Sequence, residues 1–538
     1  MNHSFNLIDE PWIPCVPLTG GPAVEVGIRD ALLKAREYRE VFSESPLVTV
    51  SLHRLLLAIL HAACNPERKQ DWRRLWGEGL PVREIAAYLE KWGPRFDLFD
   101  QEHPFYQAAG FSTGKGTPEK WEDRCFAPIR LANEAPDQNQ PLLFDHRSHI
   151  NADPCQPAQA ARWLVATQSY ALCSSNSSNI RIDGQIASTP GCKDGVAVAG
   201  MLLWLGGDSL AETLLLNLVS RKAKDGDRPA WEEEGLVTHC RESWARPQRI
   251  AGVAQLYTWQ GRLVRLPPTQ RNGHLMVSAL YFTQGRSAHD TEEQDVMDPM
   301  KAYRRDGDDK PWMAVRLDRR KAAWRDAHAL LSRDRKRFKC SGIIEQVASL
   351  IEDGSLPADT MYTINAAGIA KGKEAAKVML WRHDRFPAPG ALLTDTDMVE
   401  RLGYALRCAE TIATQLDRAN RRLCQLFLSP ETSPPPDKKD VTKLSDSIHP
   451  RRAYWSRLEG KFHTLLHDLP ADKERATDEW LHGVKTEADR AFHESAGQLG
   501  QSPRAIRARA RVYANFDPEA EDKQKSKKAR TIGEEVTI

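Results

Sequence analysis

Along the first 390 residues, the pattern of apolar and polar positions alternates between the periods typical of strands and of helices. Residues 4–28 alternate on both sides of a Thr-Gly-Gly-Pro turn at 19–22, which predicts two short strands joined by a tight turn. Residues 45–64 and 82–92 repeat apolar side chains at spacings of three and four, which predicts two amphipathic helices. Ser45 stands where a helix N-cap is expected.

Two later segments continue this mixed pattern. Residues 196–219 form the most apolar stretch, but glycines and acidic residues at 206–212 interrupt it. We therefore expect a buried strand or helix there and not a membrane span. Residues 254–259, 262–266 and 275–283 have the composition of strands.

A different pattern begins after Pro387 and Pro389. Residues 394–427 keep apolar side chains at helical spacing, and further helical runs follow at roughly 440–469, 476–499 and 502–516. The predicted fold class is α+β, with a mixed α/β N-terminal domain (1–390) followed by a C-terminal four-helix bundle (391–516). Residues 517–538 lack an apolar period and predict a disordered tail.

Composition narrows the class of protein. The 538 residues carry a net charge of only +2, so affinity for phosphate must come from local patches. The ten cysteines include no CxxC pair, which argues against a zinc cluster and a disulfide framework and favours a reducing cytoplasm. The N-terminus, with its acids and proline, lacks the features of a signal peptide.

One candidate for catalysis is the pair His383-Asp384, which resembles the metal-binding dipeptide of phosphohydrolases. A single pair cannot fill a coordination shell, and Arg382 and Arg385 flank it with charge that opposes a cation. The same dipeptide also occurs at 289–290 and 467–468, close to chance frequency. We therefore favour a structural pair over a metal-dependent nuclease, and we expect no catalytic residue, metal or cofactor.

Basic segments offer a different chemistry. Residues 317–339 concentrate arginine and lysine around Trp324 and Phe338, and residues 368–377 place lysines among small residues. Both could neutralise phosphates, as could the arginines scattered over the predicted bundle. An ordinary solvated surface remains the alternative for each.

Several motifs together resemble one family, the large CasA-type subunit of the type I-E CRISPR surveillance complex, Cascade. They are FNLIDEPWIP at the start, EHPFYQ at 102–107, PLLFDH before QAARWLVATQSYAL, and WRHD before the helical region. The resemblance implies a non-catalytic cytoplasmic protein that recognises a short motif in duplex DNA, the PAM, and helps open the strands for an R-loop. Its implied partners are a guide RNA (crRNA), double-stranded target DNA, the other Cascade subunits and a recruited helicase-nuclease, with no membrane.

The resemblance also assigns site residues. The PAM-reading loop corresponds to Asn176, Ser177, Ser178 and Asn179, where small polar residues replace the family's glycines, and a PAM-contacting lysine corresponds to Lys301. A wedge that splits the first base pairs corresponds to residues 372–377. Its tip is Glu374, Ala375 and Ala376, and the expected DNA contacts are Lys371 and Lys373.

The polar, aperiodic residues 137–155 predict a long surface loop with an apolar anchor. This loop, with Phe126 just upstream, resembles the one that docks near the 5′ handle of the guide, so Phe126, Leu142 and Phe144 are its candidate residues. A scaffold that holds subunits together without touching DNA is a further alternative.

Overall fold

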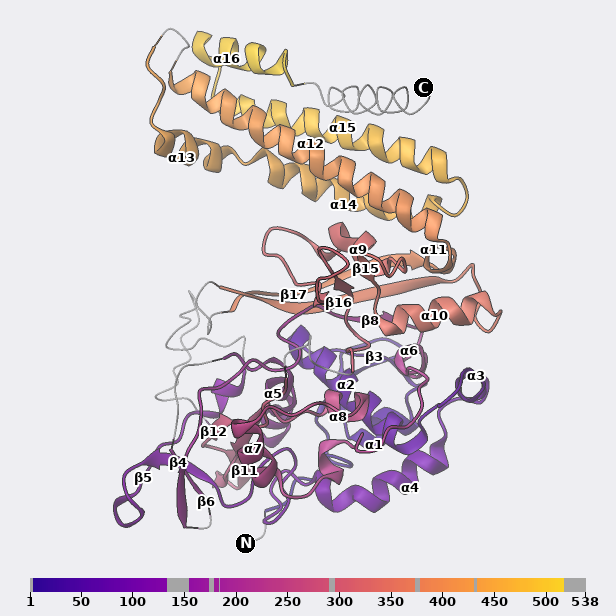
Figure 1. Ribbon diagram of the computed structural model, residues 1–538, viewed down its shortest axis with the longest axis vertical. Coiled ribbons are helices and arrows are strands. Elements are labelled where there is room, and N and C mark those ends of the chain that lie inside the picture. The colour runs from indigo at the N-terminus through magenta and orange to yellow at the C-terminus, as the bar shows by residue number, and fades with distance from the viewer. Residues whose placement is uncertain are drawn as a thin grey trace. The chain divides into compact units, whose positions relative to one another are not determined.

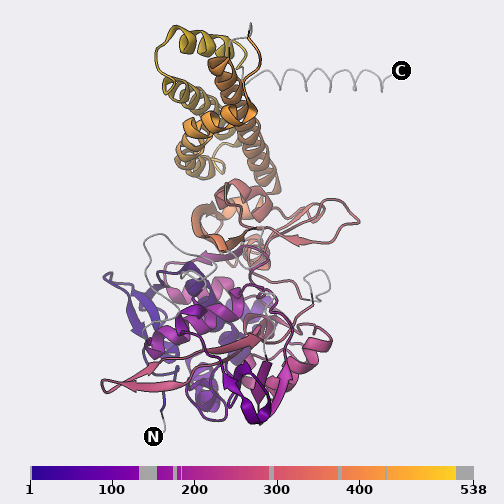
Figure 2. The same ribbon diagram turned by 90° about the vertical axis from the view of Figure 1, so that its left-hand side faces the viewer.

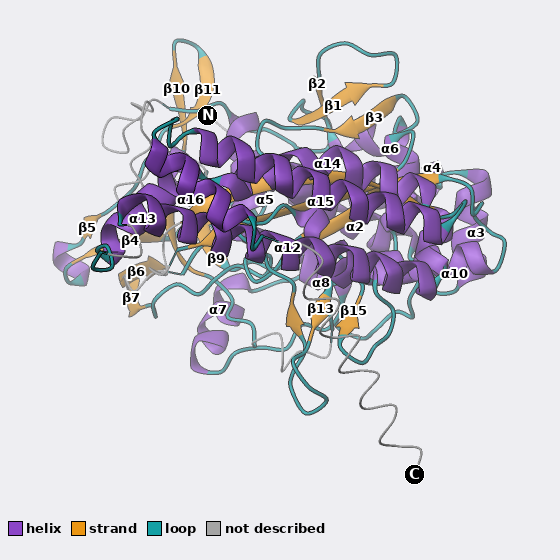
Figure 3. Ribbon diagram, turned by 90° about the horizontal axis from the view of Figure 1, so that it is seen from above, coloured by secondary structure: helices purple, strands orange, loops and turns teal. Residues whose placement is uncertain are grey.

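The computed structural model describes residues 3–132, 154–173, 179–182, 184–289, 296–372, 378–429 and 433–516. The chain divides into two compact units, Met1–Thr394 and Asp395–Ile538 (Figure 1). Helices and strands are mixed in the first unit, whereas the described part of the second contains only helices and loops (Figure 3). The expected α+β fold class is confirmed.

The first unit opens with the predicted hairpin. Strands β1 (Ile13–Pro17) and β2 (Val24–Val26) pair antiparallel, and β3 (Tyr38–Val41) pairs on the other side of β1. The turn needs glycine, because Gly20 and Gly21 have φ values of +86° and +105°, a region that side chains disfavour.

The core of this unit is built on helix α2 (Pro46–Cys64). The hydroxyl of Ser45 accepts a hydrogen bond from the amide of Val48, as the cap pattern predicts, and every residue from Pro46 to His61 is buried. By length and composition α2 would suffice to cross a membrane, but 83% of its most apolar window is buried inside the protein, as in a core helix. It packs against α4 (Val82–Trp92), α5 (Pro157–Tyr170), α6 (Leu210–Asn217) and α8 (Val253–Tyr257).

A three-stranded sheet lies beside α2, with the order β17-β16-β8. Strands β16 (Met361–Lys371) and β17 (Val378–Pro389) form a long antiparallel ladder, and β8 (Leu202–Gly206) pairs with the middle of β16. Together β8 and α6 confirm that residues 196–219 form a buried strand and helix.

Smaller sheets complete the first unit. Their orders are β5-β4-β6-β7, β12-β9, β10-β11 and β14-β13-β15. These strands are β4 (Ser112–Lys115), β5 (Glu122–Asp123), β6 (Asn179–Ile182), β7 (Gln185–Ser188), β9 (Arg262–Arg265), β10 (Pro268–Arg271), β11 (His274–Val277), β12 (Tyr281–Gln284), β13 (Tyr303–Arg304), β14 (Met313–Ala314) and β15 (Phe338–Lys339).

The remaining helices of the unit are short. They are α1 (Ile28–Leu33), α3 (Lys69–Glu78), α7 (Leu236–Ala245), α9 (Ala327–Leu331), α10 (Gly342–Glu352) and α11 (Gly390–Thr394), with 3₁₀ turns η1 (Gly93–Phe96), η2 (Pro118–Lys120), η3 (Pro128–Leu131), η4 (Ala230–Glu232) and η6 (Ala323–Asp326). The strand predicted at 254–259 is wrong, because residues 253–257 form helix α8. All five of its residues are buried, and an apolar run that short carries no period that separates helix from strand.

The second unit contains α12 (Thr396–Leu428), α13 (Lys438–Ile448), α14 (Pro450–Asp468), α15 (Lys473–Gly497) and α16 (Pro503–Tyr513). Figures 1 and 2 show these helices gathered around α12, which contacts the other four. The single helix predicted at 440–469 is two helices, α13 and α14. The residue before a proline is disfavoured in the helical region, and His449, before Pro450, takes a φ of +27°. Residues 517–538 lie outside the described residues.

Candidate nucleic-acid interface

The candidate site begins at the end of strand β16, where Lys371 is the last residue before the predicted wedge. Its ammonium donates a 2.7 Å hydrogen bond to Oδ2 of Asp194 and lies 3.4 Å from Sγ of Cys173. Partial burial is the largest single influence on the pKa of Lys371 and lowers it, but the hydrogen bond and charge of Asp194, together with the contact to Cys173, outweigh burial, so the pKa is raised and the side chain stays charged. The other wedge candidates, Lys373, Glu374, Ala375 and Ala376, lie outside the described residues.

Asp194 also contacts the segment that precedes the predicted PAM-reading loop. Its Oδ1 atom accepts a 2.8 Å hydrogen bond from the amide of Cys173. Residues 174–178, which include Asn176, Ser177 and Ser178, lie outside the described residues. Asn179 follows them as the first residue of β6, where it is exposed and pairs with Gly114 and Ser188. One carboxylate thus joins the flank of this loop to the wedge strand.

The backbone around Asp194 runs along the C-terminal end of α5. The amide of Gly195 donates to the carbonyl of Ala171 at 2.7 Å, and the amide of Ala197 donates to the carbonyl of Ser169 at 2.9 Å. A Cβ atom at Gly195 would lie 2.4 Å from the carbonyl oxygen of Ser169. Glycine is therefore required here by the close approach of two backbones.

A buried arginine also binds the two segments on either side of this contact, the one that contains Cys173 and the one that contains Asp194. Arg262, which is 1% exposed, donates to the carbonyls of Leu172 at 2.7 Å, Lys193 at 2.8 Å and Gly261 at 2.8 Å. Burial lowers its pKa, yet a guanidinium starts so high that it remains protonated. The cation is thus stabilised by backbone carbonyls that it brings together.

Lys301, the predicted PAM-contacting lysine, is a buried residue that contacts the same segment two residues beyond Asp194. It is 3% exposed, and its ammonium donates a 2.6 Å hydrogen bond to the carbonyl of Val196. Burial lowers the pKa of Lys301 to about 8, with the nearby Asp298 opposing that shift. In the free chain this side chain is therefore used inside the fold, and the assignment of Lys301 to PAM contact stays a prediction.

The pair His383-Asp384 has structural partners. His383 Nε2 lies 2.9 Å from Oδ1 of Asn365, and its ring stacks on Trp204 with centroids 4.9 Å apart. Asp384 instead accepts a 2.7 Å hydrogen bond from the amide of Ala323. Successive residues of a strand point to opposite faces, so the two side chains of this pair cannot converge on one ion.

The protonation of His383 fits this structural role. Burial and then the charge of Arg385 lower its pKa to about 4, so it is neutral near pH 7. Across the described ranges, no group of three or more His, Cys, Asp or Glu side chains is arranged to hold a metal ion. The geometry therefore opposes a metal centre at residues 383–384.

Phe126, a candidate for the guide handle, lies in an aromatic and cationic cluster. Its backbone exchanges two 2.8 Å hydrogen bonds with Leu280, and its ring meets that of Phe282 edge-on, with centroids 5.4 Å apart. The guanidinium of Arg130 lies 4.0 Å from the centre of the Phe126 ring and 5.0 Å from that of Phe282. Sequence reasoning missed Arg130, because no motif marks it. Leu142 and Phe144 lie outside the described residues.

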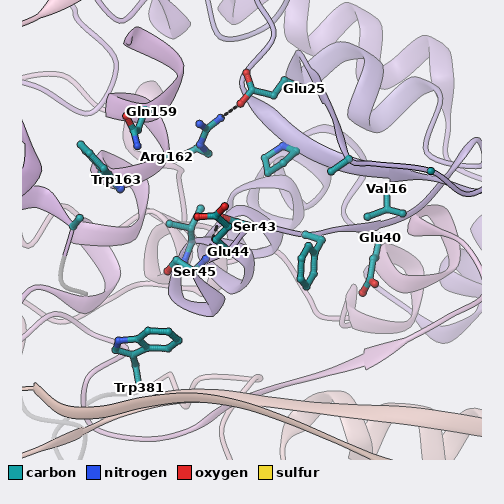
Figure 4. A pocket seen from close by; sticks show the side chains of 16 residues that line it. Val16, Glu25, Glu40, Ser43, Glu44, Ser45, Gln159, Arg162, Trp163 and Trp381 are labelled. Carbon is teal, nitrogen blue, oxygen red and sulfur yellow. Dashed lines mark hydrogen bonds and ion pairs between the residues drawn. The ribbon is translucent and has the colours of Figure 1, made fainter. Parts of the chain in front are cut away.

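A large cavity of about 1130 Å³ opens between the N-terminal hairpin, α5 and β17 (Figure 4). Trp163 and Trp381 line it, together with the carboxylates of Glu25, Glu40 and Glu44; Arg162 pairs with Glu25. This lining repels phosphates more than it attracts them. Its residues come from positions 14 to 381, so sequence spacing carried no signal for it.

Much of the basic charge noted in the sequence is already paired within each unit. In residues 317–339, Lys321 pairs with Asp326, Arg333 with Glu352 and Arg335 with Glu345. In the second unit, Arg451 pairs with both Asp417 and Glu410. These segments are therefore not continuous tracts of available cations.

Comparison with known proteins identifies relatives over nearly the full length. The family model described as CRISPR-associated protein Cse1 matches residues 6–491. The CRISPR-associated protein CasA/Cse1 of Thermus thermophilus is 32% identical over 527 residues, which cover 96% of this chain and 97% of that protein.

Solved structures agree with the sequence match. The crystal structure of CasA from Thermus thermophilus superposes with a TM-score of 0.76 at 30% identity, over 96% of this chain and 98% of that one. A chain of a solved CRISPR RNA-guided surveillance complex shares the fold, with a TM-score of 0.75 at 20% identity over 95% of this chain and 99% of that chain. The family match over most of the chain and the 32% identity are decisive, and the chain belongs to the CRISPR-associated Cse1 (CasA) family.

Proposed function

We propose that this chain is the large, non-catalytic subunit of a type I-E CRISPR RNA-guided surveillance complex in the cytoplasm. In that role it recognises the PAM in duplex DNA, helps to open the strands for the R-loop and licenses a separate helicase-nuclease. Its partners are the crRNA, the double-stranded target and the other subunits. Family membership and the fold shared with a chain of a solved surveillance complex support this proposal.

The part of the proposal that concerns DNA is supported by a contact among three segments that are separated in the sequence. Cys173 flanks the predicted PAM-reading loop, Lys371 ends the strand before the predicted wedge, and both bind Asp194. The residue that precedes the predicted loop and the strand that precedes the predicted wedge are thus joined through one carboxylate, which supports a common DNA site. A charged lysine at this point is suited to a phosphate or a groove edge.

Reconstitution tests the proposal. The chain is assembled with crRNA and the other subunits, and binding is measured to target duplexes that carry a randomised PAM. We expect strong discrimination among PAMs, and we expect Lys371→Ala to weaken binding and to reduce the salt slope by about 1.

A matched control is Lys34→Ala, which removes a lysine that also pairs with an aspartate, Asp30, at 2.9 Å on the surface. If the complex binds all PAM variants equally, or if it discriminates as well without this chain, the chain is a scaffold and the proposal fails. Cleavage by the purified chain with Mg²⁺ or Mn²⁺ would contradict its non-catalytic part.

A further inference from the structure

Asp194 uses both carboxylate oxygens to join segments that are far apart in the sequence. Oδ1 accepts from the amide of Cys173, and Oδ2 accepts from the ammonium of Lys371. We propose that Asp194 is a positioning residue that holds the flank of the PAM-reading loop and the base of the wedge hairpin at a set separation. This inference rests on the proposed function, because it assigns the two segments to one DNA-opening event.

The geometry suits a positioning role better than an incidental surface pair. The Asp194 side chain is 33% exposed and that of Lys371 is 25% exposed, so both are partly shielded from water. The bond from the amide of Cys173 fixes the Asp194 carboxylate against the backbone, so the ammonium of Lys371 meets an acceptor whose position is already held. Through Cys173 the constraint acts on the residue directly before position 174.

The fold supports Asp194 from its other side. Arg262 draws together the carbonyls of Leu172 and Lys193, which are the immediate neighbours of Cys173 and Asp194. The bond from Gly195 to Ala171 continues this pairing along α5. Residues 171–173 and 193–195 are therefore joined twice, by the buried Arg262 and by the partly exposed Asp194. Of these two connections, the one through Asp194 extends to Lys371 on the wedge strand.

An alternative explanation of the pair between Asp194 and Lys371 predicts the opposite effect on DNA binding. If Asp194 only neutralises Lys371 until DNA phosphate replaces it, then removal of the carboxylate charge frees the lysine and tightens binding. If Asp194 positions the two segments, the same change loosens them and weakens strand opening. Asp194→Asn separates the two, because the amide oxygen keeps an acceptor for Cys173 while the charge facing Lys371 is lost.

The first test uses the free chain and needs no DNA. Hydrogen exchange should be faster at the amide of Cys173 and at residues 370–372 in Asp194→Ala than in the wild type. Asp194→Asn should show the increase mainly at 370–372. Asp30→Asn, which breaks the surface pair with Lys34, is the matched control and should leave both regions unchanged. Unchanged exchange at both regions in Asp194→Ala would overturn the inference.

The second test uses the assembled complex. We expect Asp194→Asn to slow R-loop opening on a cognate PAM by about tenfold with an unaltered salt slope, since Asp194 itself touches no phosphate. In a double-mutant cycle of Asp194→Asn with Lys371→Met, the effects of the two substitutions on the rate of R-loop opening should not add. Tighter binding with a steeper salt slope would establish phosphate competition and overturn the positioning role, as would unchanged opening. If the wild-type complex does not discriminate among PAMs, the proposed function is refuted. The hydrogen-exchange result on the free chain would still show whether Asp194 holds the two segments.

Discussion

The ammonium of Lys301 donates a 2.6 Å hydrogen bond to the backbone carbonyl of Val196, two residues beyond Asp194, and the lysine side chain is buried. Nearby, Arg54 forms a 2.8 Å ion pair with Asp298 in the core. Two cations and one anion thus share this part of the interior. The carbonyl of Val196 compensates for part of the cost of the second cation.

This arrangement predicts a pH dependence of stability. The folded pKa of Lys301 is about 8, below its unfolded value near 10.5, so between these values the unfolded chain binds more protons. The free energy of unfolding should therefore rise with pH from about 8 to about 10.5, and the penalty should be fully present below pH 8. Lys301→Met should remove this component, which denaturant titrations of both proteins at pH 7 and pH 9 would measure. The difference between the two proteins isolates the contribution of Lys301 from those of all other titrating groups, and an equal pH response in both would contradict the prediction.

His383 predicts a dependence at acidic pH. Its folded pKa of about 4 lies below the unfolded value of 6.5, so the protein loses stability as the pH falls from 6.5 towards 4. Because the ring is only partly buried, we expect a loss of about 1–2 kcal/mol. His383→Gln should show a flatter profile over this range in thermal or denaturant unfolding. His53→Gln is a useful comparison, because burial also lowers the pKa of His53. A profile for His383→Gln as steep as that of the wild type would argue against a neutral, stacked His383.

Gly195→Ala tests the close approach of the Asp194 segment to α5. The added methyl group would lie 2.4 Å from the carbonyl oxygen of Ser169, so the backbones must separate, and we expect a destabilisation of about 1–3 kcal/mol. Gly460→Ala is the control, since this glycine lies within α14 with nothing within 4 Å of the added atom. That change should stabilise by about 0.5–1 kcal/mol. Equal effects of the two substitutions on urea denaturation would refute the packing argument.

The cluster of Phe126, Arg130 and Phe282 predicts an effect on assembly. Because the Arg130 guanidinium lies over the Phe126 ring, Phe126→Ala removes both a stacking surface and one of the two rings that the guanidinium contacts. We expect about tenfold weaker association of the chain with a complex that contains crRNA, measured by titration. Phe42→Ala serves as the control, because Phe42 is 45% exposed beside the acidic cavity. Similar losses for both variants would mean that Phe126 has no specific role at the guide.

The sequence by itself determined the elements with strong local signals. The turn at 19–22, helix α2 with its Ser45 cap, helix α4 and the long helix α12 all follow from periodicity and capping, which depend on neighbours in the chain. Motif order also indicated the family. Local signals failed at α8, where a five-residue apolar run has no readable period, and at His449, where Pro450 splits one predicted helix into two.

Tertiary structure alone decided how the candidate residues are used. Lys301 and Lys371 both stand between apolar or small neighbours in the sequence, yet one is buried against Val196 and the other is paired with Asp194 nearer the surface. Asp194, Arg262 and Arg130 carry no motif, because their roles arise from contacts with residues up to 177 positions away. Burial and charge pairing depend on which segments the fold brings together, and a linear pattern does not contain that information.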